Sequence, residues 1–450
     1  MLLGAPEGGE GEGIGVSLQT PEKIRNLQRG LYAKAKAEPA YRFYLLYDKV
    51  YREDILHHAY RLVRSNGGSA GVDGVRFEDI EARGLEGWLA GLGTELREET
   101  YRPSAVRRVR IPKPGGGERP LGIPTVRDRV VQTAAKLVLE PIFEADLADS
   151  AHGYRPGRSA LGAVEEVHRS LREGYTDVVD ADLSKYFDSI SHDQLMRSVA
   201  RRVSDGKMLR LIKAWLKAPV EETDEQGRRR MSGGRGSQRG TPQGGVISPL
   251  LANIYINRLL RVFLERGKDR ELLARLVNYA DDFVILSAGC AEPALEWARR
   301  VLLAMGLSLN EAKTCIRNAR KESFDFLGYT FGPTIRRDGQ RYLAARPSKK
   351  SIARVKQHIR ERLWRGNPAP WEEVAKSLNC LLRGWAGYFS YGTRHTAYKA
   401  IDRHVTLRVR TFLRRRHKVP TRGARRFGRE TIQERFGIVS LRALSVAAQP

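Results

Sequence analysis

Alternating apolar and polar positions predict a body in which helices and strands are mixed. Helical spacing, such as that of Ile55, Ala59 and Leu62, extends over residues 20–105 and returns at 127–145, 158–172, 192–218 and 292–304. A continuous apolar run at 246–258 predicts a buried helix. Short apolar runs beside turn residues predict hairpins at 109–124 and 275–286, a strand at 177–183, and strands near 324–331 and 341–344. We therefore expect an α+β fold.

Proline and glycine refine this pattern. Pro112 and Pro120 lie in the two arms of the first hairpin, and because proline lacks a backbone N–H we expect edge strands there. The glycine-rich patch at 232–236 predicts a loop that leads toward the buried helix. Residues 1–15 have neither the basic region nor the apolar segment of a signal peptide, so we expect 1–19 to be a disordered lead-in.

The pattern changes after Pro347. Ile352, Val355 and Ile359 share one helical face while Lys and Arg occupy the others, and a second helical stretch lies near 371–389. The sequence therefore predicts four parts: the lead-in at 1–19, a helical extension at 20–105, an α+β region at 106–346 and a basic helical region at 347–450.

Positive charge is the main feature of the composition. The formal net charge is +27, and residues 331–450 hold 28 Lys and Arg against 7 Asp and Glu. Between Arg403 and Arg429 there are 11 basic residues and no acidic one. A field of this size favours polyanions or acidic membrane surfaces as partners. The 450 residues contain no apolar run long enough to cross a bilayer, so we expect no membrane partner.

The cysteines exclude two further classes of protein. Cys290, Cys315 and Cys380 are too few and too far apart for a disulfide framework or a paired-cysteine zinc site. We therefore expect a reducing compartment, the cytoplasm, for this chain.

Two acidic segments carry the candidate chemistry. Asp281 and Asp282 interrupt the hairpin 275–286, and we expect the turn to expose both carboxylates at its tip. If the strand 177–183 lies beside this hairpin, Asp182 faces Asp281 and the oxygens form the kind of cluster that Mg²⁺ prefers. Two such ions about 3.5–4 Å apart would support phosphoryl transfer. Alternatively, the aspartate pair simply forms a turn.

Seven sequence blocks, in this order, resemble the reverse transcriptase/maturase encoded by bacterial group II introns. The resemblance covers about residues 20–440. The blocks are Arg119–Pro124, Gly153–Ser159, Asp182 with Phe187 and Asp188, Pro242–Asn253, Tyr279–Asp282, Lys313 with Thr314, and Phe326–Tyr329. The resemblance implies a right-hand polymerase fold, with fingers beginning in 20–105, fingers and palm in 106–346, and a thumb and maturase domain in 347–450.

The resemblance also implies roles around the metal ions. Asp182, Asp281 and Asp282 match the metal-binding aspartates of the palm, and the carbonyl of Leu183 matches an additional ligand for two Mg²⁺ ions, with Mn²⁺ as a possible substitute. Phe187 matches a bulky gate that collides with a ribose 2′-hydroxyl, so we expect a preference for deoxynucleotides. Without the resemblance, Phe187 would be read as a core aromatic.

Four more residues match positions near the incoming dNTP. Lys113 and Arg119 lie on the first hairpin, where members of this family grip the triphosphate, and Gln243 matches the residue near the sugar and the template. Lys313 matches a lysine near the pyrophosphate, where it would supply a proton or a charge. By sequence alone, the hairpin cations are equally well explained as solvated charges, and Gln243 as a loop residue.

The basic region resembles the thumb and maturase domain, which implies binding to intron RNA through arginines such as Arg414, Arg415 and Arg416. The expected partners are group II intron RNA, an RNA or DNA template with its primer, and dNTPs. Many relatives add a His-Asn-His endonuclease with paired cysteines, and the absence of those cysteines resembles the endonuclease-lacking classes.

Two other functions stay open. One is a domesticated reverse transcriptase of the same lineage, acting in CRISPR spacer acquisition or phage defence. The other is a non-catalytic RNA-binding splicing factor, against which the presence of all three aspartates argues. The sequence leaves the oligomeric state open.

Overall fold

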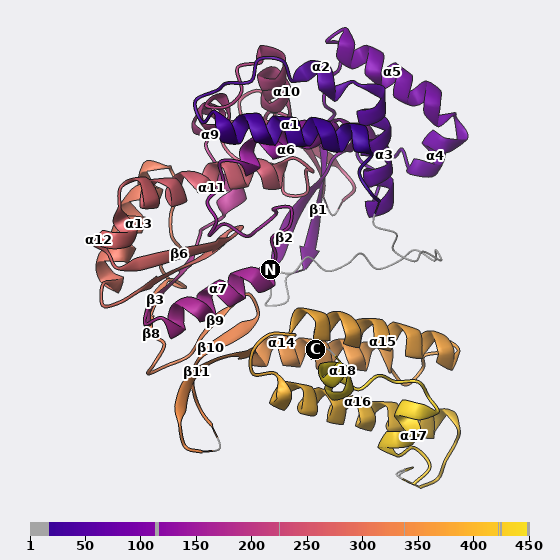
Figure 1. Cartoon of the computed structure of the whole chain (residues 1–450). Helices are drawn as coiled ribbons and strands as arrows, with labels where there is room; N and C mark the ends of the chain where they lie inside the picture. Colours follow the sequence, from indigo (N-terminus) through magenta and orange to yellow (C-terminus); the bar gives the residue numbers. More distant parts are fainter. Residues whose placement is uncertain are drawn as a thin grey trace.

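Five helices precede the first strand within residues 18–105 of the computed structural model, as the helical spacing predicts (Figure 1). The structure describes residues 18–112, 117–224, 226–336, 338–421, 423 and 425–447. The five helices are α1 (Glu22–Ala37), α2 (Tyr47–Val50), α3 (Glu53–Asn66), α4 (Phe77–Ala82) and α5 (Leu85–Arg97). Helices α1, α2 and α3 pack on the buried helix α6 (Val126–Glu144), whereas α5 packs on α3 and α4 on α5. Residues 1–17 of the expected lead-in lie outside the described residues.

The central sheet contains both predicted acidic segments. Its strand order is β6-β7-β3-β8, and each neighbouring pair is antiparallel. The hairpin β6 (Ala274–Tyr279) and β7 (Asp282–Ser287) and the strand β3 (Asp177–Asp182) confirm the predictions, whereas β8 (Cys315–Asn318) was not predicted.

Two layers cover this sheet. One face, with Val179, Ala181 and Phe283, joins the main core beside α11 (Ser248–Glu265) and α13 (Ala291–Ala304). The other face, with Val178 and Val284, packs on α7 (Ala160–Arg172) and on the small sheet of β9 (Phe324–Phe326), β10 (Tyr329–Ile335) and β11 (Arg341–Pro347). Figure 1 shows the central strands between these layers.

A second sheet has the order β2-β1-β4-β5 and corrects two predictions. β1 (Val106–Pro112) and β2 (Glu118–Ile123) form the predicted hairpin, but β1 is an inner strand because it also pairs in parallel with β4 (Pro219–Thr223). Pro112 is tolerated because the pairing with β4 ends at Arg108. The expected glycine-rich loop begins inside a strand, β5 (Arg229–Gly233), whose residues are all exposed.

The predicted helix 192–218 is two helices, α9 (His192–Ala200) and α10 (Gly206–Leu216). Asp205 causes the break. One oxygen of its carboxylate accepts hydrogen bonds from Lys207 N (2.9 Å) and Met208 N (3.1 Å) at the start of α10. The other accepts hydrogen bonds from the backbone of Leu46 and Tyr47, both at 2.8 Å. The same side chain therefore caps a helix and anchors the N-terminal helices.

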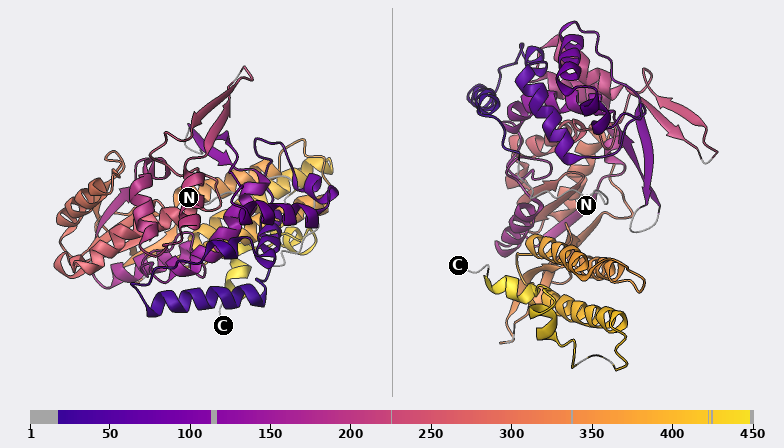
Figure 2. Two further views of the ribbon diagram at one scale, coloured as in Figure 1. Left: turned by 90° about the horizontal axis from the view of Figure 1, so that it is seen from above. Right: turned by 90° about the vertical axis from the view of Figure 1, so that its right-hand side faces the viewer.

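The C-terminal helices form a core of their own. They are α14 (Lys349–Arg362), α15 (Trp371–Tyr388), α16 (His395–Arg416), α17 (Arg429–Glu434) and α18 (Leu441–Ala447). Leu378, Leu382 and Ile401 are fully buried there, in a cluster separate from the main core. Figure 2 shows that these helices extend on the same side of the molecule as the β1–β2 and β4–β5 hairpins. None of the described helices is long and apolar enough to cross a membrane.

Candidate active site

Asp182 and Asp282 face each other across β3 and β7. They are cross-strand partners in the antiparallel register, so their side chains share one face of the sheet. This corrects the expectation that Asp182 faces Asp281. Asp281 lies with Ala280 in the tight turn between β6 and β7, whereas Asp282 is already the first residue of β7. Only one of the two neighbouring aspartates therefore occupies the tip.

Buried amides hold the turn in place. Ala280 has φ +59°, a conformation that few non-glycine residues adopt. Asn278 Nδ2 donates to the carbonyls of Ala280 (2.9 Å) and Asp282 (3.3 Å). Gly153 packs so closely that a Cβ there would overlap the Ala280 nitrogen, and its carbonyl accepts from Asn253 Nδ2 at 2.7 Å. Asn253 ends one of the blocks of the sequence analysis and Asn278 lies in the predicted hairpin 275–286, but no local signal showed that they support the turn.

A lysine neutralises part of the negative charge of the carboxylates. Burial raises the pKa of Asp282, and the nearby charges of Asp281 and Asp182 raise it further. Lys313 Nζ lies 2.9 Å from Asp182 Oδ2, and Asn310 Nδ2 donates to the same oxygen at 3.2 Å. Its hydrogen bond to Asp182 raises the pKa of Lys313, so this side chain stays positively charged at neutral pH. The structure thus brings Lys313 to the aspartates, as the sequence analysis expected.

A fourth carboxylate lies deeper on the same face. Asp180 precedes Asp182 by two residues, so both side chains point to the same side of β3. The pKa of Asp180 is raised to about 6, mainly by burial; Arg317 opposes the rise, and the charges of Asp282, Asp325 and Asp182 contribute to it. The sequence analysis gave Asp180 no role.

The carboxylate oxygens of this site are chemically suited to bind a divalent cation. Among the described residues, no three His, Cys, Asp or Glu side chains are grouped as a metal site. Asp182 and Asp282 nevertheless present oxygens from neighbouring strands, and their mutual repulsion is the situation that a cation relieves. The Lys313 ammonium supplies part of that positive charge. The Leu183 side chain has no donor atom, so only its backbone carbonyl is suited to act as a ligand.

Phe187 lies directly after the acidic strand, in the one-turn helix α8 (Tyr186–Ser189). Its ring is partly buried and packs edge-on against Tyr186, with centroids 5.5 Å apart. Tyr186 is fixed in turn, because its hydroxyl donates to Ala252 O at 2.6 Å. The Phe187 carbonyl accepts from Thr241 N at 2.8 Å, which ties this helix to the loop that carries Gln243.

The Gln243 loop contacts the first hairpin. Gly122 N, on β2, donates to Gln243 O at 2.5 Å. Arg119, earlier on β2, and Asp281 both influence Tyr154. The pKa of Tyr154 is raised to about 12, mainly by burial; the charge of Asp281 contributes to the rise and that of Arg119 opposes it. Arg119 and Asp281 are therefore both near Tyr154, which joins the candidate site as a further neighbour, and Gln243 is held against β2. Lys113 lies outside the described residues.

The three arginines proposed for RNA binding differ in their surroundings. Arg414 packs beside Gly423, close enough to contact a Cβ at that position. Arg416 Nη1 donates to Ala369 O at 2.8 Å. Arg415 and Arg416 line a pocket of about 360 Å³ together with Arg365 and Arg408. The basic surface is thus built by a wider set of arginines than the run 414–416.

Two family models match this chain. Residues 111–331 match the reverse transcriptase (RNA-dependent DNA polymerase) family, and residues 352–429 match the maturase-specific domain of group II introns. The first match contains the aspartates, and the second contains the basic helices. The fold is therefore that of a right-hand polymerase, as the motifs predicted.

Curated relatives agree with this assignment. Protein YkfC of Escherichia coli is 36% identical over 68% of this chain and 87% of its own length. The group II intron-encoded protein LtrA of Lactococcus lactis subsp. cremoris is 30% identical over 66% of this chain, which spans 59% of LtrA. Among solved structures, the match to a telomerase from Candida albicans covers 73% of this chain and 62% of the telomerase chain, with 13% identity and a TM-score of 0.42. The chain belongs to the group II intron-encoded reverse transcriptases.

Proposed function

We propose that this chain extends a primer 3′-hydroxyl with dNTPs on an RNA template, and also on DNA. The observation that carries the proposal is the pairing of Asp182 with Asp282 beside the braced turn of Asp281, inside the region that matches reverse transcriptases. We further propose fingers and palm within 106–346 and a thumb and maturase domain within 347–450.

Three carboxylates would hold the metal ions. Asp182, Asp281 and Asp282, with the Leu183 carbonyl, provide the hard oxygen ligands that Mg²⁺ prefers, and Mn²⁺ would substitute. When bound, two such ions activate the attacking hydroxyl and stabilise the leaving pyrophosphate. The raised pKa of Lys313 keeps its ammonium protonated, which suits it to neutralise the pyrophosphate or to donate a proton to it.

The surrounding residues would select the nucleotide. The partly buried ring of Phe187 is fixed by Tyr186, so a steric gate at this place would not move aside easily. Arg119 offers bidentate contacts to phosphate oxygens, and Lys113 would add a point charge. Gln243 is held near β2 by the contact of its backbone with Gly122. These features support binding of a dNTP between the first hairpin and the aspartates.

We propose that the C-terminal helices bind group II intron RNA and so assist splicing and mobility. The proposal rests on the maturase-specific match, on the basic excess of this region and on the arginine-lined pocket of Arg415 and Arg416. Arg414 would contribute less, because it packs beside Gly423. Folded RNA is recognised mainly by its shape, phosphates and 2′-hydroxyls, so binding would stabilise the intron while the RNA performs its own chemistry.

Primer extension on an RNA template, measured together with intron RNA affinity, tests the proposal. We expect Asp281→Asn to abolish extension and to leave RNA affinity unchanged, because it removes one metal-binding charge from the partly exposed tip of the turn and keeps the size of the side chain. Extension by this variant at the wild-type rate would refute the polymerase role. Failure of the wild-type chain to prefer group II intron RNA over an unrelated structured RNA would refute the maturase role and favour a domesticated enzyme.

A further inference from the structure

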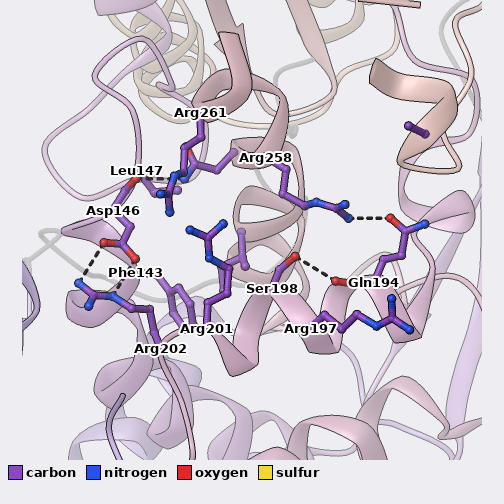
Figure 3. A pocket seen from close by; sticks show the side chains of 13 residues that line it. Phe143, Asp146, Leu147, Gln194, Arg197, Ser198, Arg201, Arg202, Arg258 and Arg261 are labelled. Carbon is purple, nitrogen blue, oxygen red and sulfur yellow. Dashed lines mark hydrogen bonds and ion pairs between the residues drawn. The ribbon is translucent and has the colours of Figure 1, made fainter. Parts of the chain in front are cut away.

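A pocket of about 500 Å³ lies between α9 and α11, away from the residues discussed above (Figure 3). Each helix contributes side chains at the spacing i, i+3, i+4, i+7, so the pocket is lined by one continuous stripe from each. From α9 and its C-cap residue these are Gln194, Arg197, Ser198 and Arg201, and from α11 they are Ile254, Asn257, Arg258 and Arg261. Each stripe therefore supplies two arginines.

The lining is strongly basic. It contains five arginines and one carboxylate, Asp146. That carboxylate is already neutralised, because Arg202 binds it with Nε at 2.8 Å and Nη2 at 3.0 Å. Arg202 is only 3% exposed and also donates to the carbonyls of Glu38 and Pro39, so its role is to anchor the N-terminal segment. The positive charge of the other four arginines is therefore not balanced by Asp146.

These four arginines are only partly engaged by protein groups. Arg258 Nη1 donates to the neutral Gln194 Oε1 at 2.7 Å, and Arg261 pairs with the exposed Glu265. Among the described residues, the side chains of Arg197 and Arg201 have no hydrogen-bond or ion-pair partner. Figure 3 shows Arg201 and Arg261 extending into the pocket from the two helices. Positive charges that lie this close repel one another, and a bound anion would relieve that repulsion.

The pocket lies behind the central sheet. Val179, Ala181 and Phe283 point to the face that packs with α11, whereas Asp182 and Asp282 point to the opposite face. The pocket is formed on the far side of α11, with Phe143 and Ile254 buried in its lining. A ligand bound here would therefore not meet the primer terminus.

Arginines at this spacing suit consecutive phosphate groups. Arg197 and Arg201 are four residues apart, which corresponds to about 6 Å along the helix, similar to the separation of neighbouring phosphates on a strand. Guanidinium groups bind phosphates in a bidentate manner, and the buried apolar residues offer contact for a sugar or base. We propose that this pocket binds adjacent phosphates of an RNA strand and forms a second RNA-binding surface behind the palm. This inference rests on the proposed RNA-binding function and extends it to the opposite face.

The test measures binding of a labelled, folded RNA hairpin to full-length protein whose cleft is already filled with an RNA–DNA primer–template. We expect R197Q/R201Q to weaken hairpin binding several-fold and to lower the salt slope by about 1.5, since each lost phosphate contact removes about 0.7–0.9. The charge-matched control R320Q/K321Q, in the exposed turn before β9, should retain both values. Primer extension should be unchanged in both variants, which also shows that they fold.

Three other outcomes would overturn the inference. If R197Q/R201Q binds the hairpin like wild type while R415Q weakens it, the maturase surface stands and the pocket is not an RNA site. If the wild-type chain does not bind the hairpin at all, the proposed RNA-binding function fails as well. If inorganic tripolyphosphate binds wild type but not R197Q/R201Q, and hairpin affinity is equal in the two, the pocket is a site for small polyphosphates instead.

Discussion

Replacing Asp180 by asparagine should stabilise the metal-free protein at neutral and alkaline pH. Burial raises the pKa of Asp180 from 3.8 to about 6 in the folded chain. This carboxyl therefore favours folding while it is protonated, below about pH 4, and the contribution is lost as the pH rises through about 6. Asparagine fills the same space and never ionises, so the variant does not lose unfolding free energy at this position as the pH rises.

The magnitude follows from the size of the pKa shift. A rise from 3.8 to about 6 corresponds to about 3 kcal/mol of unfolding free energy, because each tenfold change in acidity is worth about 1.4 kcal/mol. This is a large share of the roughly 5–15 kcal/mol that holds a typical domain together. Asp282 and Asp182 contribute to the shift, so cations bound at those residues should reduce it.

Urea denaturation of both proteins across pH, in EDTA and in excess Mg²⁺, measures this effect. In EDTA the advantage of Asp180→Asn should grow between about pH 4 and pH 6 and then level off. In excess Mg²⁺ the stability advantage of Asp180→Asn should level off at a smaller value. Asp193→Asn, an exposed substitution on α9, serves as the control, because Asp193 is not among the groups that raise the pKa of Asp180. An advantage of Asp180→Asn that does not change with pH would refute the reasoning.

Three further predictions concern other parts of the site and the basic helices. Gly153→Ala adds a methyl that overlaps the Ala280 backbone, so we expect primer extension to fall about a hundredfold and thermal stability to drop; unchanged kinetics would mean that the turn is not held there. Phe187→Ala should raise ribonucleotide incorporation relative to deoxynucleotide incorporation, and an unchanged ratio in competition assays would support a purely structural ring. Arg415→Gln should reduce the salt slope of intron RNA binding by about 0.7–0.9 in filter-binding titrations, whereas a wild-type slope would remove this arginine from the RNA surface.

The central hairpin could be predicted from the sequence because its two apolar arms are buried and meet at a polar turn. The register was less accessible, since a shift of one residue decides whether Asp281 or Asp282 faces Asp182. The strand β5 was missed because its residues are all exposed, so no buried face leaves a pattern. The arginine pocket between α9 and α11 joins segments about 60 residues apart, and nothing local links them.

The measurement that tests the central claim most directly is single-nucleotide primer extension on an RNA template by Asp282→Asn and by the control Asp325→Asn. Both substitutions remove one negative charge from the same region, but only Asp282 faces Asp182 across the sheet. We predict that Asp325→Asn extends at the wild-type rate and that Asp282→Asn is slower by about a hundredfold or more, as expected when several kcal/mol of transition-state stabilisation are lost. Equal rates for the two variants would contradict the assignment of these aspartates as the catalytic centre.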